Sequence, residues 1–147
     1  MTQPAIELQE SPSAEVLDAI VGGVRAFNRA AAGHPPPRPV ACVVRNAEGG
    51  IDGGVWAELW GRSVHIAALW VDERLRGGGL GARLLREVEA YAARQGHRLA
   101  YVETLGFQAR PFYERQGYRV FGVLDEIAEG TSFYFMRKDL PAASSEP

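Results

Sequence analysis

Apolar residues recur with two different periods along the chain, first a helical one and then a strand-like one. Between residues 13 and 31 they return every three or four positions behind a capping serine, Ser13, which predicts a helix with one buried face. The segment 33–39 contains four prolines, so it can be neither helix nor central strand and predicts a stiff connector. From Val40 onward the period becomes two, which is typical of strands.

The strand-like period predicts a sheet. Strands over 40–45, 51–60 and 63–71 are separated by short turns, and are therefore expected to be antiparallel neighbours. The stretch from His65 to Val71 is mostly apolar, which predicts a central strand buried on both faces.

The remaining elements alternate between helix and strand. Behind a glycine-rich turn a helix runs to Gln95, and the strand at 98–104 is reached through that helix, so it is expected to lie parallel to its neighbour. A short helix over 108–116 precedes a final antiparallel pair, 118–124 and 132–137, which is linked by residues 125–131.

The sum is an α/β (α+β) fold with a mixed, mostly antiparallel sheet and helices on both faces. We expect a single domain over 1–140 and a disordered tail over 141–147, where the residues are small and polar.

Composition narrows the classes of function. A hydrophobic fraction of 46% and a charged fraction of 23% are those of a soluble globular domain. A net charge of −2 gives no electrostatic reason to expect nucleic acid or an anionic membrane as partner. With no apolar run of membrane-spanning length and no leader-like start, a cytoplasmic location is expected. Cys42 is the single cysteine, which excludes an intrachain disulfide and a cysteine-built metal site; it predicts a buried strand residue, and no metal is expected.

The most informative stretch is the glycine-rich turn at 76–82. Its glycines let the backbone approach a ligand closely, and the following helix directs free N–H groups and the positive end of its dipole toward the turn. Arg76 adds a planar fork of donors. This arrangement suits a phosphate or a pyrophosphate.

Two motifs carry a family resemblance. Val71-x4-Arg76-x-x-Gly79-x-Gly81 resembles the acetyl-CoA signature of the GNAT superfamily of N-acetyltransferases. Further along, Ala109-x-x-Phe112-Tyr113-x-x-x-Gly117-Tyr118 is similar to the second motif of that family. The predicted order of elements over roughly 13–138 fits as well. More narrowly, Leu69-Trp70-Val71 with Thr104-x3-Gln108-Ala109 resembles a bacterial group, most of whose members have no assigned acceptor.

The resemblance implies a sheet splayed at the cofactor site and an acetyl-CoA site built from the motif residues. Backbone N–H groups would hold the pyrophosphate, and the end of the preceding strand would pair with the pantetheine arm. The cofactor-binding residues implied are Leu69, Trp70, Val71, Arg76, Gly77, Gly78, Gly79, Leu80, Gly81, Ala82, Gln108, Phe112, Tyr113 and Arg115.

Acid and base candidates follow from the same comparison. Tyr113 matches the family tyrosine that protonates the leaving thiolate, although packing against the cofactor is the alternative reading. Where some members place a glutamate base, this chain has His65, which either titrates as a base or is a partly buried strand residue. Glu103 is the rival base. His34 and His97 lie in turn contexts, which predicts exposed surface residues.

The implied reaction is direct transfer of an acetyl group from acetyl-CoA to a primary amine of a small molecule or peptide, with a homodimer as a common family arrangement. Acceptor-site candidates are Phe27, the 33–39 connector, Trp56, Trp60 and the acidic residues from Asp125 to Glu129. Hairpin packing is the alternative for the two tryptophans. One alternative function is a module of this fold that binds acyl-CoA without turnover. Another is dinucleotide binding through Gly77-x-Gly79-x-x-Ala82, which the three preceding antiparallel strands disfavour.

Overall fold

The computed structural model describes residues 2–142, apart from the side chains of Phe107 and Gln108. The chain divides into two compact units between Pro36 and Pro37. A single domain over 1–140 therefore stays a prediction, and the predicted tail lies outside the described residues from residue 143 onward.

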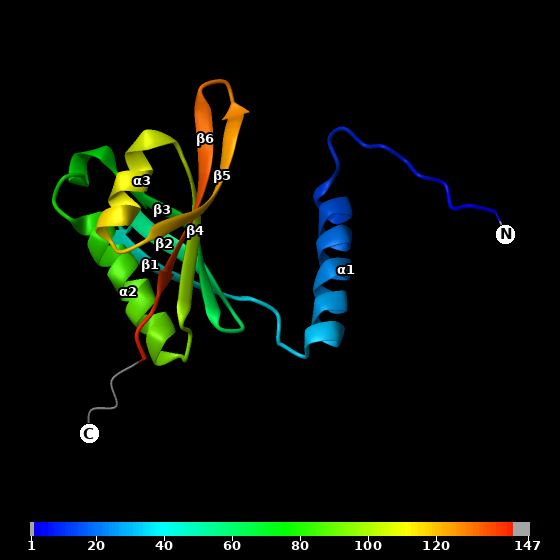
Figure 1. Ribbon diagram of the computed structural model, residues 1–147, viewed down its shortest axis with the longest axis horizontal. Coiled ribbons are helices and arrows are strands. Elements are labelled where there is room, and N and C mark those ends of the chain that lie inside the picture. Colours follow the sequence, from blue (N-terminus) through cyan, green and yellow to red (C-terminus); the bar gives the residue numbers. More distant parts are fainter. Residues whose placement is uncertain (1, 143–147) are drawn as a thin grey trace. The chain divides into compact units, whose positions relative to one another are not determined.

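The first unit contains one helix, α1 (Ala14–Ala32), close to the predicted 13–31 (Figure 1). Its N-terminus is capped by Ser13, whose Oγ accepts from the backbone N–H of Val16 at 3.3 Å. Its C-terminus is closed by Gly33 in the left-handed region. The apolar stripe that includes Leu17 and Phe27 has no core within this unit to cover it. No helix in the described part of the chain is long and apolar enough to cross a membrane.

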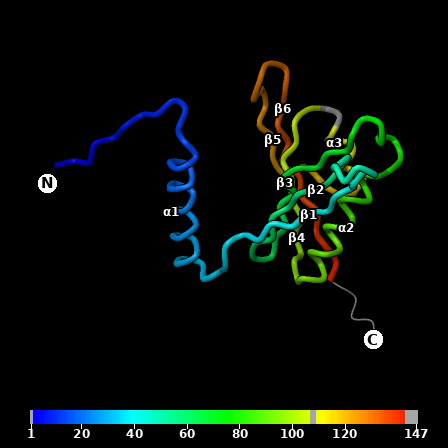
Figure 2. Tube along the Cα trace, turned by 180° about the vertical axis from the view of Figure 1, so that it is seen from behind, coloured from blue at the N-terminus to red at the C-terminus, as the bar shows by residue number. Residues whose placement is uncertain are grey.

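The second unit is built on a six-stranded sheet in the order β1-β2-β3-β4-β6-β5 (Figures 1 and 2). β3 and β4 are parallel, as expected for strands joined through a helix, and all other neighbours are antiparallel. The mixed α/β fold is thereby confirmed. The strands are β1 (Arg38–Arg45), β2 (Ile51–Trp60), β3 (Ser63–Val71), β4 (Leu99–Leu105), β5 (Arg119–Ala128) and β6 (Thr131–Asp139).

Two helices pack on the same face of this sheet. α2 (Leu80–Arg94) follows a short 3-10 turn, η1 (Glu73–Leu75), and lies against β1, β2 and β3. α3 (Gly106–Arg115), which begins two residues earlier than predicted, lies against β4 and β6. One core contains Leu85 and Val88 of α2, Ile66 of β3, Met136 of β6 and Tyr113 of α3. A helix on the opposite face stays a prediction.

The central strand β3 is buried on one face only, so the prediction of burial on both faces was wrong. Val64 and Ile66 are buried, whereas Trp70 is 49% exposed. A bulge explains the change of phase along the strand. Trp56 pairs with Ala68 and Ala57 pairs with Ile66, which leaves Ala67 as an extra residue. Because of this insertion Leu69, and not Ala68, continues the face of Ile66.

The sheet is splayed between β3 and β4, as the family resemblance implies. Pairing begins at Ser63 with Leu99 and ends at Ile66 with Val102. Beyond that point β3 remains paired with β2 alone, and β4 with β6 alone. The edge of β3 that faces β4 is therefore open over Ala67–Val71.

The final hairpin is longer than predicted. Segment 125–131 was expected to be a loop, yet β5 continues to Ala128 and β6 begins at Thr131. Pairing is irregular between Leu124 and Ala128, where Glu126 has φ of 51°. The polar composition of the segment hid a strand, because both of its faces are exposed near the hairpin tip.

Candidate active site

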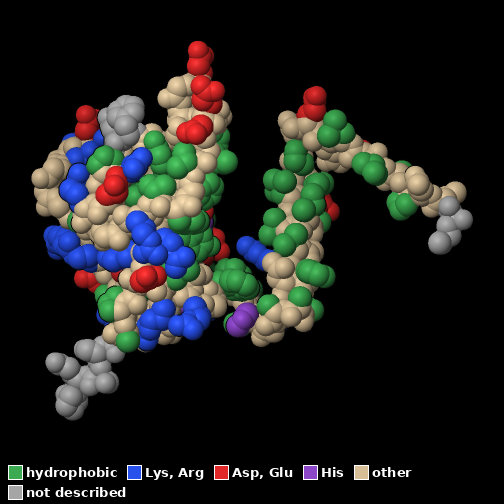
Figure 3. Space-filling model, in the orientation of Figure 1, with side chains coloured by type: hydrophobic (Ala, Val, Ile, Leu, Met, Phe, Trp, Pro, Cys, Tyr) green, Lys and Arg blue, Asp and Glu red, His purple; other side chains and the backbone are tan. Residues whose placement is uncertain are grey.

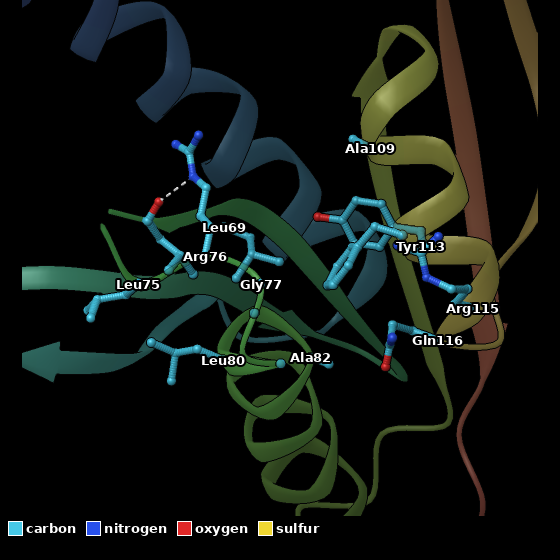
Figure 4. Close-up of a pocket in the computed structure, with 14 residues that line it drawn as sticks. Leu69, Leu75, Arg76, Gly77, Leu80, Ala82, Ala109, Tyr113, Arg115 and Gln116 are labelled. Carbon is cyan, nitrogen blue, oxygen red and sulfur yellow. Dashed lines mark hydrogen bonds between the residues drawn. The ribbon is translucent and has the colours of Figure 1, made fainter. Parts of the chain in front are cut away.

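A cavity of about 470 Å³ lies between the glycine-rich turn, the end of β3 and α3 (Figure 4). Its volume falls within the range of small-molecule sites. The residues that line it are Leu69, Val71, Leu75, Arg76, Gly77, Gly79, Leu80, Gly81, Ala82, Ala109, Phe112, Tyr113, Arg115 and Gln116.

The start of α2 presents uncapped N–H groups to this cavity. Gly77 has φ of 86° and Gly79 has φ of 81°, values that favour glycine. Gly79 is the N-cap residue and supplies no side chain, and the first turn contains no acidic residue. The N–H groups of Leu80, Gly81 and Ala82 are thus left for a ligand, together with the positive end of the helix dipole.

Arg76 holds the turn against the strand that precedes it. Its Nε donates to the carbonyl oxygen of Val71 at 2.9 Å, the bond drawn in Figure 4. At the start of the turn, the carboxylate of Asp72 accepts from the backbone N–H and the Nε of Arg74. These bonds lower the pKa of Asp72 and fix the entry to the turn.

The open edge of β3 offers further backbone groups. The N–H of Asp72 donates to Asp52 on the β2 side at 2.8 Å. Because backbone N–H groups alternate between the two edges of a strand, those of Val71 and Leu69 point to the edge away from β2. That edge has no strand partner beyond Ile66. An extended amide-containing ligand can therefore pair with it as an added strand does.

Tyr113 closes the cavity from the α3 side. Tyr113 is 6% exposed, and its hydroxyl points from α3 toward β3 and the glycine-rich turn (Figure 4). The ring makes edge contacts with Phe112 at 5.0 Å and Tyr118 at 5.5 Å between centroids. Burial raises the pKa of Tyr113 to about 12, so the hydroxyl keeps its proton at neutral pH.

His65 and Glu103 form a pair on the other face of the sheet. The Nε2 of His65 lies 2.6 Å from Oε2 of Glu103, and each side chain is 28% exposed. The imidazole also stacks on Tyr101, with centroids 4.6 Å apart. Val64, Ile66 and Val102 face the α2 side, so the alternation of β3 and β4 turns His65 and Glu103 to the opposite face. The pair lies where pairing of the two strands ends, beside the splay.

Most of the predicted cofactor residues meet in one cavity. Trp70 and Gly78 do not line it; the bulge at Ala67 turns Trp70 to the opposite face. The side chain of Gln108 lies outside what the structure describes. The sequence analysis did not assign three lining residues: Leu75, Ala109 and Gln116. Ala109 is part of the second motif and could have been included on that basis.

Two further sequence predictions have different outcomes. His97 was expected to be exposed but is only 7% exposed, because it folds back beneath the end of α2, where its backbone N–H donates to Ala92. Cys42 is half-buried on β1 as a strand residue. Burial and the nearby Glu87 raise the pKa of its thiol, which disfavours a nucleophilic thiolate. Among the described residues, no group of three or more His, Cys, Asp or Glu is placed to hold a metal ion.

Charge is distributed unevenly over the second unit (Figure 3). In this view basic side chains gather on the side of the unit that carries α2 and the glycine-rich turn. Acidic side chains gather at the tip of the β5–β6 hairpin. The side of the glycine-rich turn is thus suited to an anionic ligand.

The site combines an open strand edge, a glycine turn with uncapped N–H groups and a buried tyrosine. A comparison with family models agrees with this combination. Residues 38–120 match the model of the acetyltransferase (GNAT) domain. The chain belongs to the GNAT acetyltransferases. The matched range contains the residues that line the cavity and both strands, β3 and β4, that separate at the splay.

Known proteins of this family resemble the chain to different extents. A crystal structure of an Agrobacterium tumefaciens protein assigned as an acetyltransferase superposes with a TM-score of 0.88 and 28% identity, covering 92% of this chain and 99% of the other. Blasticidin-S acetyltransferase of Streptomyces morookaense is 37% identical over 93 residues, which are 63% of this chain and 68% of that protein.

A more distant structure was solved with acetyl coenzyme A bound. A Bacillus anthracis protein assigned as a streptothricin acetyltransferase, solved in complex with acetyl coenzyme A, has a TM-score of 0.62 and 20% identity. The alignment covers 71% of this chain and 64% of the other. At that identity the likeness concerns the fold.

Proposed function

We propose that this GNAT acetyltransferase transfers the acetyl group of acetyl-CoA directly to a primary amine of a small molecule or peptide. The observation that carries the proposal is the joining of the uncapped α2 N-terminus, the open edge of β3 and the Tyr113 hydroxyl in one cavity. The blasticidin-S relative supports a small-molecule acceptor, and the acetyl-CoA complex of the distant neighbour supports this cosubstrate.

The residues of the cavity fit the parts of acetyl-CoA. The N–H groups of the first α2 turn and Arg76 would hold the pyrophosphate. The N–H groups of Leu69 and Val71 would pair with the amides of the pantetheine arm. Phe112 and Arg115 would contact the cofactor tail. When bound, acetyl-CoA supplies a thioester whose carbonyl carbon an amine can attack.

Two proton transfers are assigned to residues on either side of the splay. The His65–Glu103 pair accepts the proton that the acceptor ammonium must lose, because it provides a carboxylate and an imidazole at the beginning of the splay. Tyr113 donates a proton to the leaving sulfur, a role for which its raised pKa keeps it protonated. The raised thiol pKa of Cys42, and its position outside the cavity lining, favour direct transfer over an acetyl-cysteine intermediate.

The proposal is tested in two steps. Thermal unfolding is first measured with acetyl-CoA, CoA, NAD or no ligand; a ligand at about a hundred times its Kd should stabilise the chain by roughly 2.7 kcal/mol. Stabilisation by both CoA species and not by NAD is expected. CoA release is then followed with a panel of primary amines. Stabilisation without release from any amine would favour the alternative, a module that binds acyl-CoA without turnover.

A further inference from the structure

A second group of polar and aromatic side chains lies on the sheet face that carries His65 and Glu103. On β2 the buried residues are Val55, Ala57 and Leu59, so Trp56, Glu58 and Trp60 share the opposite face. Trp56 is 48% exposed and Trp60 is 40% exposed. Glu58 is thus flanked along its strand by two accessible indole rings, each displaced from it by roughly 7 Å of backbone.

This stripe lies next to the proposed catalytic pair. Glu58 is in register with His65 across the β2–β3 ladder. Directly paired residues have Cβ atoms about 5 Å apart, so the two side chains are neighbours. Tyr101, which stacks on His65, has its pKa raised by burial first and then by the charges of Glu103 and Glu58. Both carboxylates therefore act on the same patch of the surface.

Glu58 differs from Glu103 in its partners. Glu103 is paired with His65. Within the part of the chain that the structure describes, no basic side chain forms an ion pair with Glu58. A half-exposed carboxylate flanked by indole faces provides both an opposite charge and cation–π surfaces. A positively charged group is the ligand that this combination recognises.

We propose that Trp56, Glu58 and Trp60 form a subsite for a second positive charge of the acceptor, so that the enzyme prefers amines with another cationic group a few carbons away. The inference rests on the proposed function, because it places the reacting amine at the His65–Glu103 pair. From the in-register neighbours, the two nitrogens of the acceptor are separated by a chain of about three to six carbons.

The test compares diamines with monoamines in the full chain loaded with CoA. Calorimetric titration is carried out with linear α,ω-diamines of three to six carbons and with the monoamine of each length. For at least one length the diamine is expected to bind roughly tenfold more tightly than its monoamine, beyond the statistical advantage of two equivalent amines. Glu58→Gln should reduce this preference to the statistical level.

A matched control is Glu48→Gln, which removes the same charge from the exposed β1–β2 turn. It should preserve the diamine preference. A wild-type protein without preference at any length, or a preference that survives in Glu58→Gln, would overturn the subsite. The titration measures amine binding and does not require turnover, so it tests the subsite alone. Failure of the proposed function would be seen in a separate assay, in which the chain binds CoA but transfers no acetyl group.

Discussion

The hydroxyl of Tyr118 donates to Oε2 of Glu89 at 2.7 Å, deep between α2 and the end of α3. The other oxygen of the same carboxylate accepts from Nζ of Lys138, the single lysine of the chain, at 2.8 Å. Burial, the charge of Glu89 and the hydrogen bond from Tyr118 to Glu89 hold the pKa of Tyr118 well above its ordinary value. The Tyr118 ring also contacts the ring of Tyr113. The Glu89 network therefore helps to hold Tyr113, the proposed general acid, in position.

Replacing Glu89 by alanine should strongly destabilise the fold. Breaking a buried ion pair costs about 3–5 kcal/mol, and the loss here should fall toward the lower end because the Lys138 side chain is 24% exposed. Chemical denaturation measures the effect. Glu114→Ala is the control, since its pair with Arg110 is exposed on both sides and is worth about 0.5 kcal/mol or less. Equal losses in the two variants would contradict a structural role for the network.

Gly79→Ala should weaken CoA binding more than Gly78→Ala. A Cβ at either position meets no protein atom within 4 Å, so neither substitution causes a clash in the unliganded chain. Gly79 has φ of 81°, where alanine costs about 1–2 kcal/mol, while Gly78 has no positive φ. We expect at least a tenfold rise in the Kd for CoA with Gly79→Ala, measured by calorimetry. Similar affinities in both variants would argue against binding by the backbone of the turn.

Tyr113→Phe should lower kcat by about a hundredfold or more and leave the Kd for acetyl-CoA nearly unchanged, as expected for loss of a general acid. Phe112→Leu is the matched control, because it alters packing in the same cavity without removing a proton donor. If Tyr113→Phe turned over at the wild-type rate, Tyr113 would have a packing role only.

The raised pKa of Tyr113 also predicts an effect at alkaline pH. A group whose folded pKa of about 12 exceeds its unfolded value of about 10 contributes stability fully below pH 10 and loses it as the pH rises toward 12. The midpoint of thermal unfolding should therefore fall less steeply above pH 10 in Tyr113→Phe than in the wild type. Parallel profiles would show that the tyrosinate is not excluded by burial.

His97 predicts the opposite dependence at acidic pH. Burial, followed by the charge of Arg38, lowers its pKa, so its contribution to stability is complete above the unfolded pKa of about 6.5 and is lost as the pH falls. The Tm of the wild type should drop between pH 7.5 and pH 5, and His97→Gln should flatten this part of the profile.

The sequence by itself determined the local elements and the glycine-rich turn. Ser13 and Gly33 set the ends of α1 because capping depends on neighbouring backbone groups. The positions of Gly77, Gly79 and Gly81 likewise required a turn that opens a helix. The parallel pairing of β3 with β4 followed from the connecting helix.

Only the tertiary structure decided which faces these elements present. The bulge at Ala67 reverses the alternation of β3, so Leu69 and Val71 line the cavity while Trp70 does not. The contact between His65 and Glu103 joins residues 38 positions apart, and the burial of His97 depends on how the chain turns after α2. Such features arise from pairing between distant segments, which the residues of one segment do not encode on their own.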